Sequence, residues 1–233
     1  MELKTDKPVF TVALTTFLTF LLLFLLPRKS LGIDAIWWLY PNLLFAIGWF
    51  GFLIHSHRNI TEDESSQLLS SCVLFGFAAT AIYLPMDRLF SRHGKLQFIV
   101  YHSSDFLVNV TTPIGLILTW VLFATLTVYL YHRLKMFGLQ PFVASGITGM
   151  AAGIGSVAIY MLGKELWVWN PLRVDNIPNI ASVPIFMPIT YVLTFTLCPY
   201  YFHREQHALI AGARCGLFMG VIMFLSFLLF WMQ

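Results

Sequence analysis

Residues 208–231, "ALIAGARCGLFMGVIMFLSFLLFW", form an apolar run in which Arg214 is the single charged residue. A helix rises about 1.5 Å per residue, so roughly 20 apolar residues cross the hydrocarbon core of a bilayer. The run therefore predicts a membrane-spanning helix. Gly212, Gly216 and Gly220 recur every fourth residue within it, a spacing typical of a face along which a second helix packs closely.

The rest of the chain has the same character. Of its 233 residues, 58% are hydrophobic and only 11% are charged, and the mean hydropathy is +0.75. A water-soluble domain does not have this composition. Six further runs approach the spanning length: Pro8 to Pro27, Ile36 to His55, Leu68 to Met86, Pro113 to Tyr131, Phe142 to Leu162, and Val183 to Phe202.

These runs predict an all-α fold, a multi-pass integral membrane bundle of seven transmembrane helices. The connections are short, so residues 1–233 are expected to form a single transmembrane domain. The first run ends in Pro27-Arg28-Lys29 instead of a small-residue cleavage site, which favours a retained span over a signal peptide. Residues 96–112 are too polar and too short for an ordinary span, and we expect a short amphipathic or re-entrant helix there.

Histidines at the ends of the predicted spans indicate a candidate metal site. His203 and His207 are four residues apart, so a helix beginning near His203 would present both imidazoles to one ion. A site needs at least one more ligand, and His55 is expected at the same membrane surface because alternate connections emerge on one side. Zinc is the candidate metal. The alternative is a group of histidines that the interface merely tolerates.

This arrangement resembles the seven-helix zinc hydrolases of the alkaline ceramidase and adiponectin-receptor type. The resemblance covers His55, His203 and His207 and implies hydrolysis by a metal-activated water. Those families also have a serine four residues before the first histidine, where this chain has Gly51, and an aspartate in the third helix, where the first carboxylate is Asp87. Residues 167–191 resemble carotenoid-modifying membrane enzymes in their content of aromatic residues and proline.

A second group of candidate catalytic residues is expected at the other surface. If residues 96–112 are helical, His102 and Asp105 are close enough to hydrogen-bond, and the carboxylate would prepare the imidazole as a general base. The alternative is that both residues lie on the water-exposed face of an amphipathic helix in the membrane interface. Glu165 lies near Trp167 and Trp169, so we expect it to be a desolvated acid beside an aromatic belt.

Arg214 is the charged residue expected deepest in a span. Such an arginine is a hypothesis for a functional site, and here it would bind an anionic group of the substrate. The alternative is an arginine whose side chain only reaches back to the membrane surface.

Together these residues predict an enzyme that modifies a lipid or isoprenoid substrate at the membrane interface, by hydrolysis or hydration, with membrane lipids as its partners. A net charge of +3, without a basic stripe, gives no reason to expect nucleic-acid binding. Two alternatives stay open. One is a transporter in which Arg214, Asp105 and Glu165 line a polar path, and the other is a non-catalytic assembly subunit.

Overall fold

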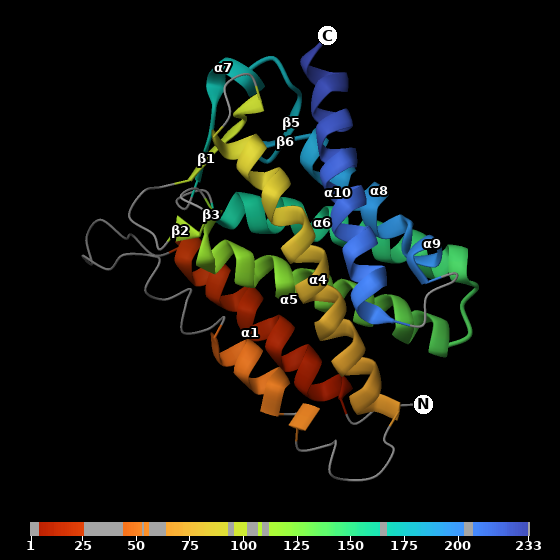
Figure 1. Cartoon of the computed structure of the whole chain (residues 1–233). Helices are drawn as coiled ribbons and strands as arrows, with labels where there is room; N and C mark the ends of the chain where they lie inside the picture. The colour runs from red at the N-terminus through yellow and green to blue at the C-terminus, as the bar shows by residue number, and fades with distance from the viewer. Residues whose placement is uncertain are drawn as a thin grey trace.

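The computed structural model describes residues 5–25, 44–52, 54–55, 64–92, 96–101, 107–108, 112–163, 167–202 and 207–232. The described chain is a bundle of helices with short strands at one end (Figure 1). Its helices are α1 (Asp6–Leu25), α4 (Glu64–Arg92), α5 (Ile114–Met136), α6 (Pro141–Leu162), α7 (Pro171–Val174), α8 (Phe186–Thr196), α9 (Cys198–Phe202) and α10 (Ala208–Trp231). Residues 44–52 and 54–55 are also helical.

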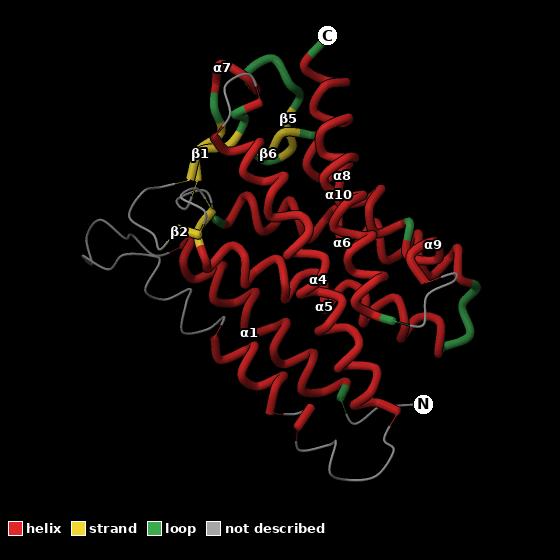
Figure 2. The backbone as a smooth tube through the Cα atoms, viewed as in Figure 1, coloured by secondary structure: helices red, strands yellow, loops and turns green. Residues whose placement is uncertain are grey.

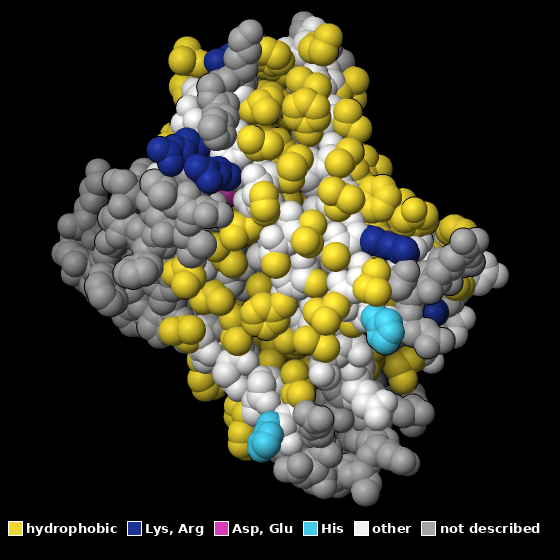
Figure 3. Space-filling view, in the orientation of Figure 1, with side chains coloured by type: hydrophobic (Ala, Val, Ile, Leu, Met, Phe, Trp, Pro, Cys, Tyr) yellow, Lys and Arg dark blue, Asp and Glu magenta, His cyan; other side chains and the backbone are white. Residues whose placement is uncertain are grey.

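Within the described residues, four helices are long and apolar enough to cross a membrane: Gln67–Arg92, Ile114–Met136, Pro141–Leu162 and Ala208–Trp231. These helices are those of a membrane protein, and they agree with four of the seven predicted spans. Hydrophobic side chains cover most of the face seen in Figure 3, and Lys and Arg lie there in a few small groups.

The sixth predicted span, residues 183–202, is interrupted in the structure. It begins as a strand at Val183–Pro184, continues as α8, and breaks at Leu197 before the five-residue helix α9. Pro199 explains the break, because it has no N–H for the carbonyl of Phe195 and its ring would clash with that carbonyl in a continuous helix. Neither α8 nor α9 reaches the spanning length by itself.

The glycine row formed by Gly212, Gly216 and Gly220 packs against a second helix, as predicted. A side chain at Gly212 would collide with the backbone of Phe75, and one at Gly216 with the backbone of Ala79, so α10 lies directly on α4. Because successive glycines meet successive turns of α4, the two helices run parallel. On the other side of the bundle, Gly149 lets α6 approach Thr196 of α8 in the same way.

The short strands lie together with α7 at the upper left of Figure 2, and we call this the ribbon end of the bundle. They pair as three antiparallel ribbons: β1 (Ile99–Tyr101) with β4 (Trp167–Trp169), β2 (Leu107–Val108) with β3 (Thr112–Pro113), and β5 (Asn179–Ile180) with β6 (Val183–Pro184). α4 ends and α5 begins at the ribbon end, and α5 ends at the opposite end.

The helix predicted over residues 96–112 is therefore wrong for the described part of that segment, where β1, β2 and the start of β3 are strands. The sequence Phe98-Ile99-Val100-Tyr101 is rich in β-branched and aromatic residues, which suit a pleated surface. Its partner, Trp167-Val168-Trp169, lies 66 or more residues away, so helical periodicity within the segment could not reveal the pairing.

Candidate functional site

Asp87 is the centre of a buried polar network at the ribbon end. Its side chain lies in the last turns of α4, is 2% exposed, and accepts a hydrogen bond on each carboxylate oxygen. Tyr101 Oη of β1 donates to Oδ1 and Thr112 Oγ1 of β3 donates to Oδ2, both at 2.7 Å. Among the residues that the structure describes, no Lys, Arg or His forms an ion pair with Asp87. Its hydrogen-bond partners are neutral hydroxyls.

Tyr101 joins this network to an aromatic cavity. In the β1–β4 ribbon, Tyr101 is directly opposite Trp167, and directly opposite residues of an antiparallel pair project from the same face. Burial raises the pKa of the Tyr101 phenol well above its usual value, and the neighbouring Asp87 raises it further. Tyr101 therefore keeps its proton, and in this structure it is the donor to Asp87.

The cavity itself has a volume of about 420 Å³. It is lined by Tyr160, Met161, Trp167, Val168, Trp169, Ala181 and Ser182. The ring of Tyr160 lies 5.3 Å from that of Trp167 and 5.4 Å from that of Trp169, measured between centroids. A volume in this range is typical of small-molecule sites.

The turn between β5 and β6 forms part of the rim. Ala181 and Ser182 both have positive φ angles, 51° and 66°. Two-residue hairpin turns of this kind favour Asn and Gly, and other residues adopt the left-handed region at a cost. Strained backbone of this type gathers at binding and catalytic sites, which fits the position of the turn beside the cavity.

A row of aromatic rings continues from the cavity into the bundle. The ring of Tyr160 lies 6.3 Å from that of Tyr191, and the ring of Tyr83 lies 4.9 Å from that of Trp120, measured between centroids. Tyr191 and Trp120 border a small interior space of about 20 Å³, together with Tyr83 and Phe123. Aromatic rings thus extend from the ribbon end toward the middle of the bundle.

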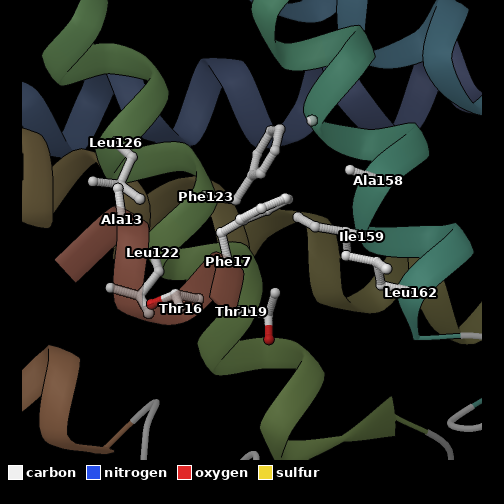
Figure 4. A pocket seen from close by; sticks show the side chains of 11 residues that line it. Ala13, Thr16, Phe17, Thr119, Leu122, Phe123, Leu126, Ala158, Ile159 and Leu162 are labelled. Atoms are coloured by element: carbon white, nitrogen blue, oxygen red, sulfur yellow. The ribbon is translucent and has the colours of Figure 1, made fainter. Parts of the chain in front are cut away.

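An apolar groove of about 220 Å³ lies on the other side of Phe123, between α1, α5 and α6. Figure 4 shows the rings of Phe17 and Phe123 directed into it, with Ile159 and Leu162 of α6 along one wall. Thr119 donates its hydroxyl to the carbonyl of Gly115. Two of its walls belong to α5 and α6, which are long and apolar enough to cross a membrane.

Four of the predicted site residues, His102, Asp105, Glu165 and His203, lie outside the described residues. Their roles stay predictions. The described residues neither include nor position the His102–Asp105 pair.

The apolar run 208–231 is a helix with the bounds that the sequence predicts, so a helix that begins near His203 and continues through His207 is not observed at His207. α10 begins at Ala208, and His207 is its exposed N-cap with extended backbone angles. A helical pair of imidazoles therefore cannot include His207 through α10. His55 is exposed, and within the described residues no three His, Cys, Asp or Glu side chains are grouped to hold a metal. The metal site formed by His55, His203 and His207 stays a prediction, as does zinc.

Arg214 is partly buried in the first third of α10, toward the end of the bundle opposite to Asp87. Its expected role as an anion ligand stays a prediction. Asp87 was given no role from the sequence, because the third predicted span stopped at Met86. The available signal was a carboxylate inside an apolar helix, which is costly and marks a functional site by default.

A comparison of the chain with protein-family models, curated proteins and solved structures found no match. The chemistry of the site is therefore the guide to function.

Proposed function

We propose that the protein is a membrane-embedded enzyme that modifies a lipid or isoprenoid substrate by adding water, through hydration of a double bond or hydrolysis. The observation that supports this is Asp87, a buried carboxyl group held by two hydroxyls beside an aromatic cavity. A carboxyl group is a common general acid or base. Its protonated form carries no charge, which suits a buried group whose described partners are neutral hydroxyls.

In a hydration, Asp87 would provide the proton. The Tyr101 hydroxyl would pass its own proton to one carbon of a double bond while accepting the proton of Asp87, which leaves a carbocation on the neighbouring carbon. The rings of Trp167, Trp169 and Tyr160 would stabilise that positive charge. Water then forms the new C–O bond and returns a proton to Asp87. Water is the only co-reactant.

In a hydrolysis, the same acid would protonate the leaving oxygen while water attacks the adjacent carbon. A metal-activated water is a further route, and it depends on the predicted ligands His55, His203 and His207. Arg214 would then bind an anionic group. Both reactions place the apolar part of the substrate in surroundings like the groove between α1, α5 and α6.

The test is expression of the wild type and of Asp87→Asn in a host membrane, incubated in heavy-oxygen water. Mass spectrometry of the extracted lipids should find wild-type products that carry one heavy oxygen atom, formed much more slowly by Asp87→Asn. Asp6→Asn is the matched control, because Asp6 is a second carboxylate in a hydrogen-bonded network at the opposite end.

Equal labelling in cells with and without the wild-type protein would sink the enzyme proposal and favour transport or assembly. Labelled products that disappear equally in Asp87→Asn and Asp6→Asn would remove Asp87 from the chemistry, because both variants would then act through folding.

A further inference from the structure

One side of α4 carries a row of exposed apolar side chains. Four of them are between 38% and 45% exposed, namely Leu74, Phe77, Ile82 and Leu89. We call this row the outer stripe of α4. The other side of the helix packs on α10, so the outer stripe points away from the bundle. An exposed apolar surface on a helix long enough to cross a membrane is suited to contact with lipid chains.

Two arginines close the outer stripe at the ribbon end. Arg88 and Arg92 are both exposed, and they lie in the last turns of the apolar stretch Gln67–Arg92. Because successive helical residues turn by about 100°, Phe77, Arg88 and Arg92 lie within roughly 60° of one another. Figure 3 shows a small group of Lys and Arg side chains near the ribbon end, with hydrophobic side chains over much of the same face.

The positions of the two arginines favour one shared anion. Residues four apart on a helix have Cβ atoms about 5–6 Å apart, so both guanidinium groups can reach the same phosphate. In the part of the chain that the structure describes, neither Arg88 nor Arg92 forms an ion pair with a carboxylate. Both cations are therefore available to an anion from outside the protein.

The length of the outer stripe matches one leaflet of a bilayer. Phe77 and Arg88 are 11 residues apart, which is about 16 Å along the helix axis. The hydrocarbon of one leaflet is about 15 Å deep, half of a core of about 30 Å. An acyl chain whose headgroup lies at the arginines would run past Leu89 and Ile82 and end near Phe77.

We propose that the outer stripe of α4 binds an acidic phospholipid, with Arg88 and Arg92 donating hydrogen bonds to the headgroup phosphate. An acidic headgroup has a net negative charge for the two guanidinium groups, whereas a zwitterionic headgroup brings a cation of its own that competes with them. Asp87 is on the buried side of the same helix. The lipid site is thus separate from the proposed catalytic site and does not depend on the proposed function.

Native mass spectrometry of the full-length protein in detergent measures this binding without turnover. The probes are phosphatidylglycerol and phosphatidylcholine with identical acyl chains, and glycerophosphoglycerol, which is the acidic headgroup without chains. The wild type should bind phosphatidylglycerol on the order of tenfold more tightly than phosphatidylcholine, as expected for charge-assisted hydrogen bonds to one phosphate. Glycerophosphoglycerol should bind more weakly than the intact lipid, because it cannot cover the apolar stripe.

Three double variants locate the site. Arg88→Gln with Arg92→Gln should reduce the preference for phosphatidylglycerol to about onefold, and both positions are exposed, so the fold should persist. Arg88→Lys with Arg92→Lys retains both charges and should retain most of the preference. The matched control is Lys7→Gln with Lys135→Gln, which removes two exposed cations at the opposite end of the bundle and should bind as the wild type does.

Several outcomes would overturn the assignment. Equal binding of the two lipids by the wild type would do so, and so would a preference retained without Arg88 and Arg92. An equal loss in the lysine control would show general charge attraction without a site on α4. Glycerophosphoglycerol bound as tightly as the intact lipid would indicate a site for free phosphate, and a dimer that excludes the lipid would assign the stripe to a second copy of the chain.

Discussion

Two carboxylates at opposite ends of the bundle, one buried and one partly buried, are bonded in different ways. Asp6, at the start of α1, accepts from Arg133 Nη2 at 2.6 Å and from the Tyr129 hydroxyl at 2.8 Å. Asp87, near the end of α4, accepts from Tyr101 and Thr112, both at 2.7 Å. Among the described residues, the partners of Asp6 include a cation, whereas those of Asp87 are hydroxyls.

The difference between these partners suits Asp6 to a structural role and Asp87 to a chemical one. A guanidinium can only donate, so Asp6 must stay ionised for its network to persist. A hydroxyl both donates and accepts, so the Asp87 network can keep its hydrogen bonds when the carboxyl group takes up a proton. Asp6 ties α1 to α5, whereas Asp87 is suited to proton transfer.

Asp87→Asn should have the largest effect on activity. Loss of a general acid typically lowers a rate on the order of 100- to 10,000-fold, while the amide can still accept from one hydroxyl and limits the loss of stability. The rate of heavy-oxygen incorporation measures this effect. Asp6→Asn should keep a rate near that of the wild type, and a comparable loss in both variants would erase the distinction between the two ends.

Arg133→Met should have the largest effect on stability. It leaves the Asp6 carboxylate partly buried without its cation, and we expect the free energy of unfolding to fall by about 2–4 kcal/mol. Asp6 is 26% exposed, which lowers the penalty relative to a fully buried pair. Denaturation in detergent measures the change. Adding Asp6→Asn should recover part of it, and an unchanged stability of Arg133→Met would show that the pair contributes nothing.

Tyr101→Phe should lower stability by about 1–2 kcal/mol, because Asp87 then loses one of its two donors. The pKa of Tyr101 is raised in the folded protein, while an unfolded tyrosine titrates near 10. Its stabilising contribution is therefore complete below about pH 10 and is lost as the pH rises further. Unfolding measured from about pH 9 to 11 should show a smaller alkaline loss in Tyr101→Phe, and an identical loss would contradict the assignment.

Tyr129→Phe should have the smallest effect, about 0.5–1 kcal/mol. The Tyr129 hydroxyl contacts both Asp6 and Thr5, but Arg133 still balances the charge of Asp6 after its removal. Denaturation in detergent measures this loss in the free energy of unfolding. A loss as large as that of Tyr101→Phe would mean that hydroxyl donors matter equally at both ends, whether or not a cation is present.

The features that local patterns predict are the ones the structure confirms. Spanning helices such as α5 and α10 follow from runs of apolar residues, and the close contacts of Gly212 and Gly216 follow from their spacing. The break at Leu197 is a local effect of Pro199 that hydropathy alone did not register. Hydropathy averages over a window, whereas one missing N–H ends a helix.

The candidate site could not be read from periodicity, because its parts are distant in the chain. Asp87 and Thr112 are 25 residues apart, and Tyr101 meets Trp167 only through the pairing of β1 with β4. The histidine pattern that the sequence favoured depends on a helix beginning near His203, and α10 begins at Ala208 instead.

By itself the sequence determined that the chain is apolar enough for a membrane, where its long helices lie, and which small residues let them approach. Those properties depend on composition and on spacings within one helix. The tertiary structure decided which polar groups meet, because strand pairing and helix contacts bring together side chains that no local rule relates. Strand pairing and helix contacts are the reason that the described donors to Asp87 are neutral hydroxyls, whereas Asp6 is paired with the cation of Arg133.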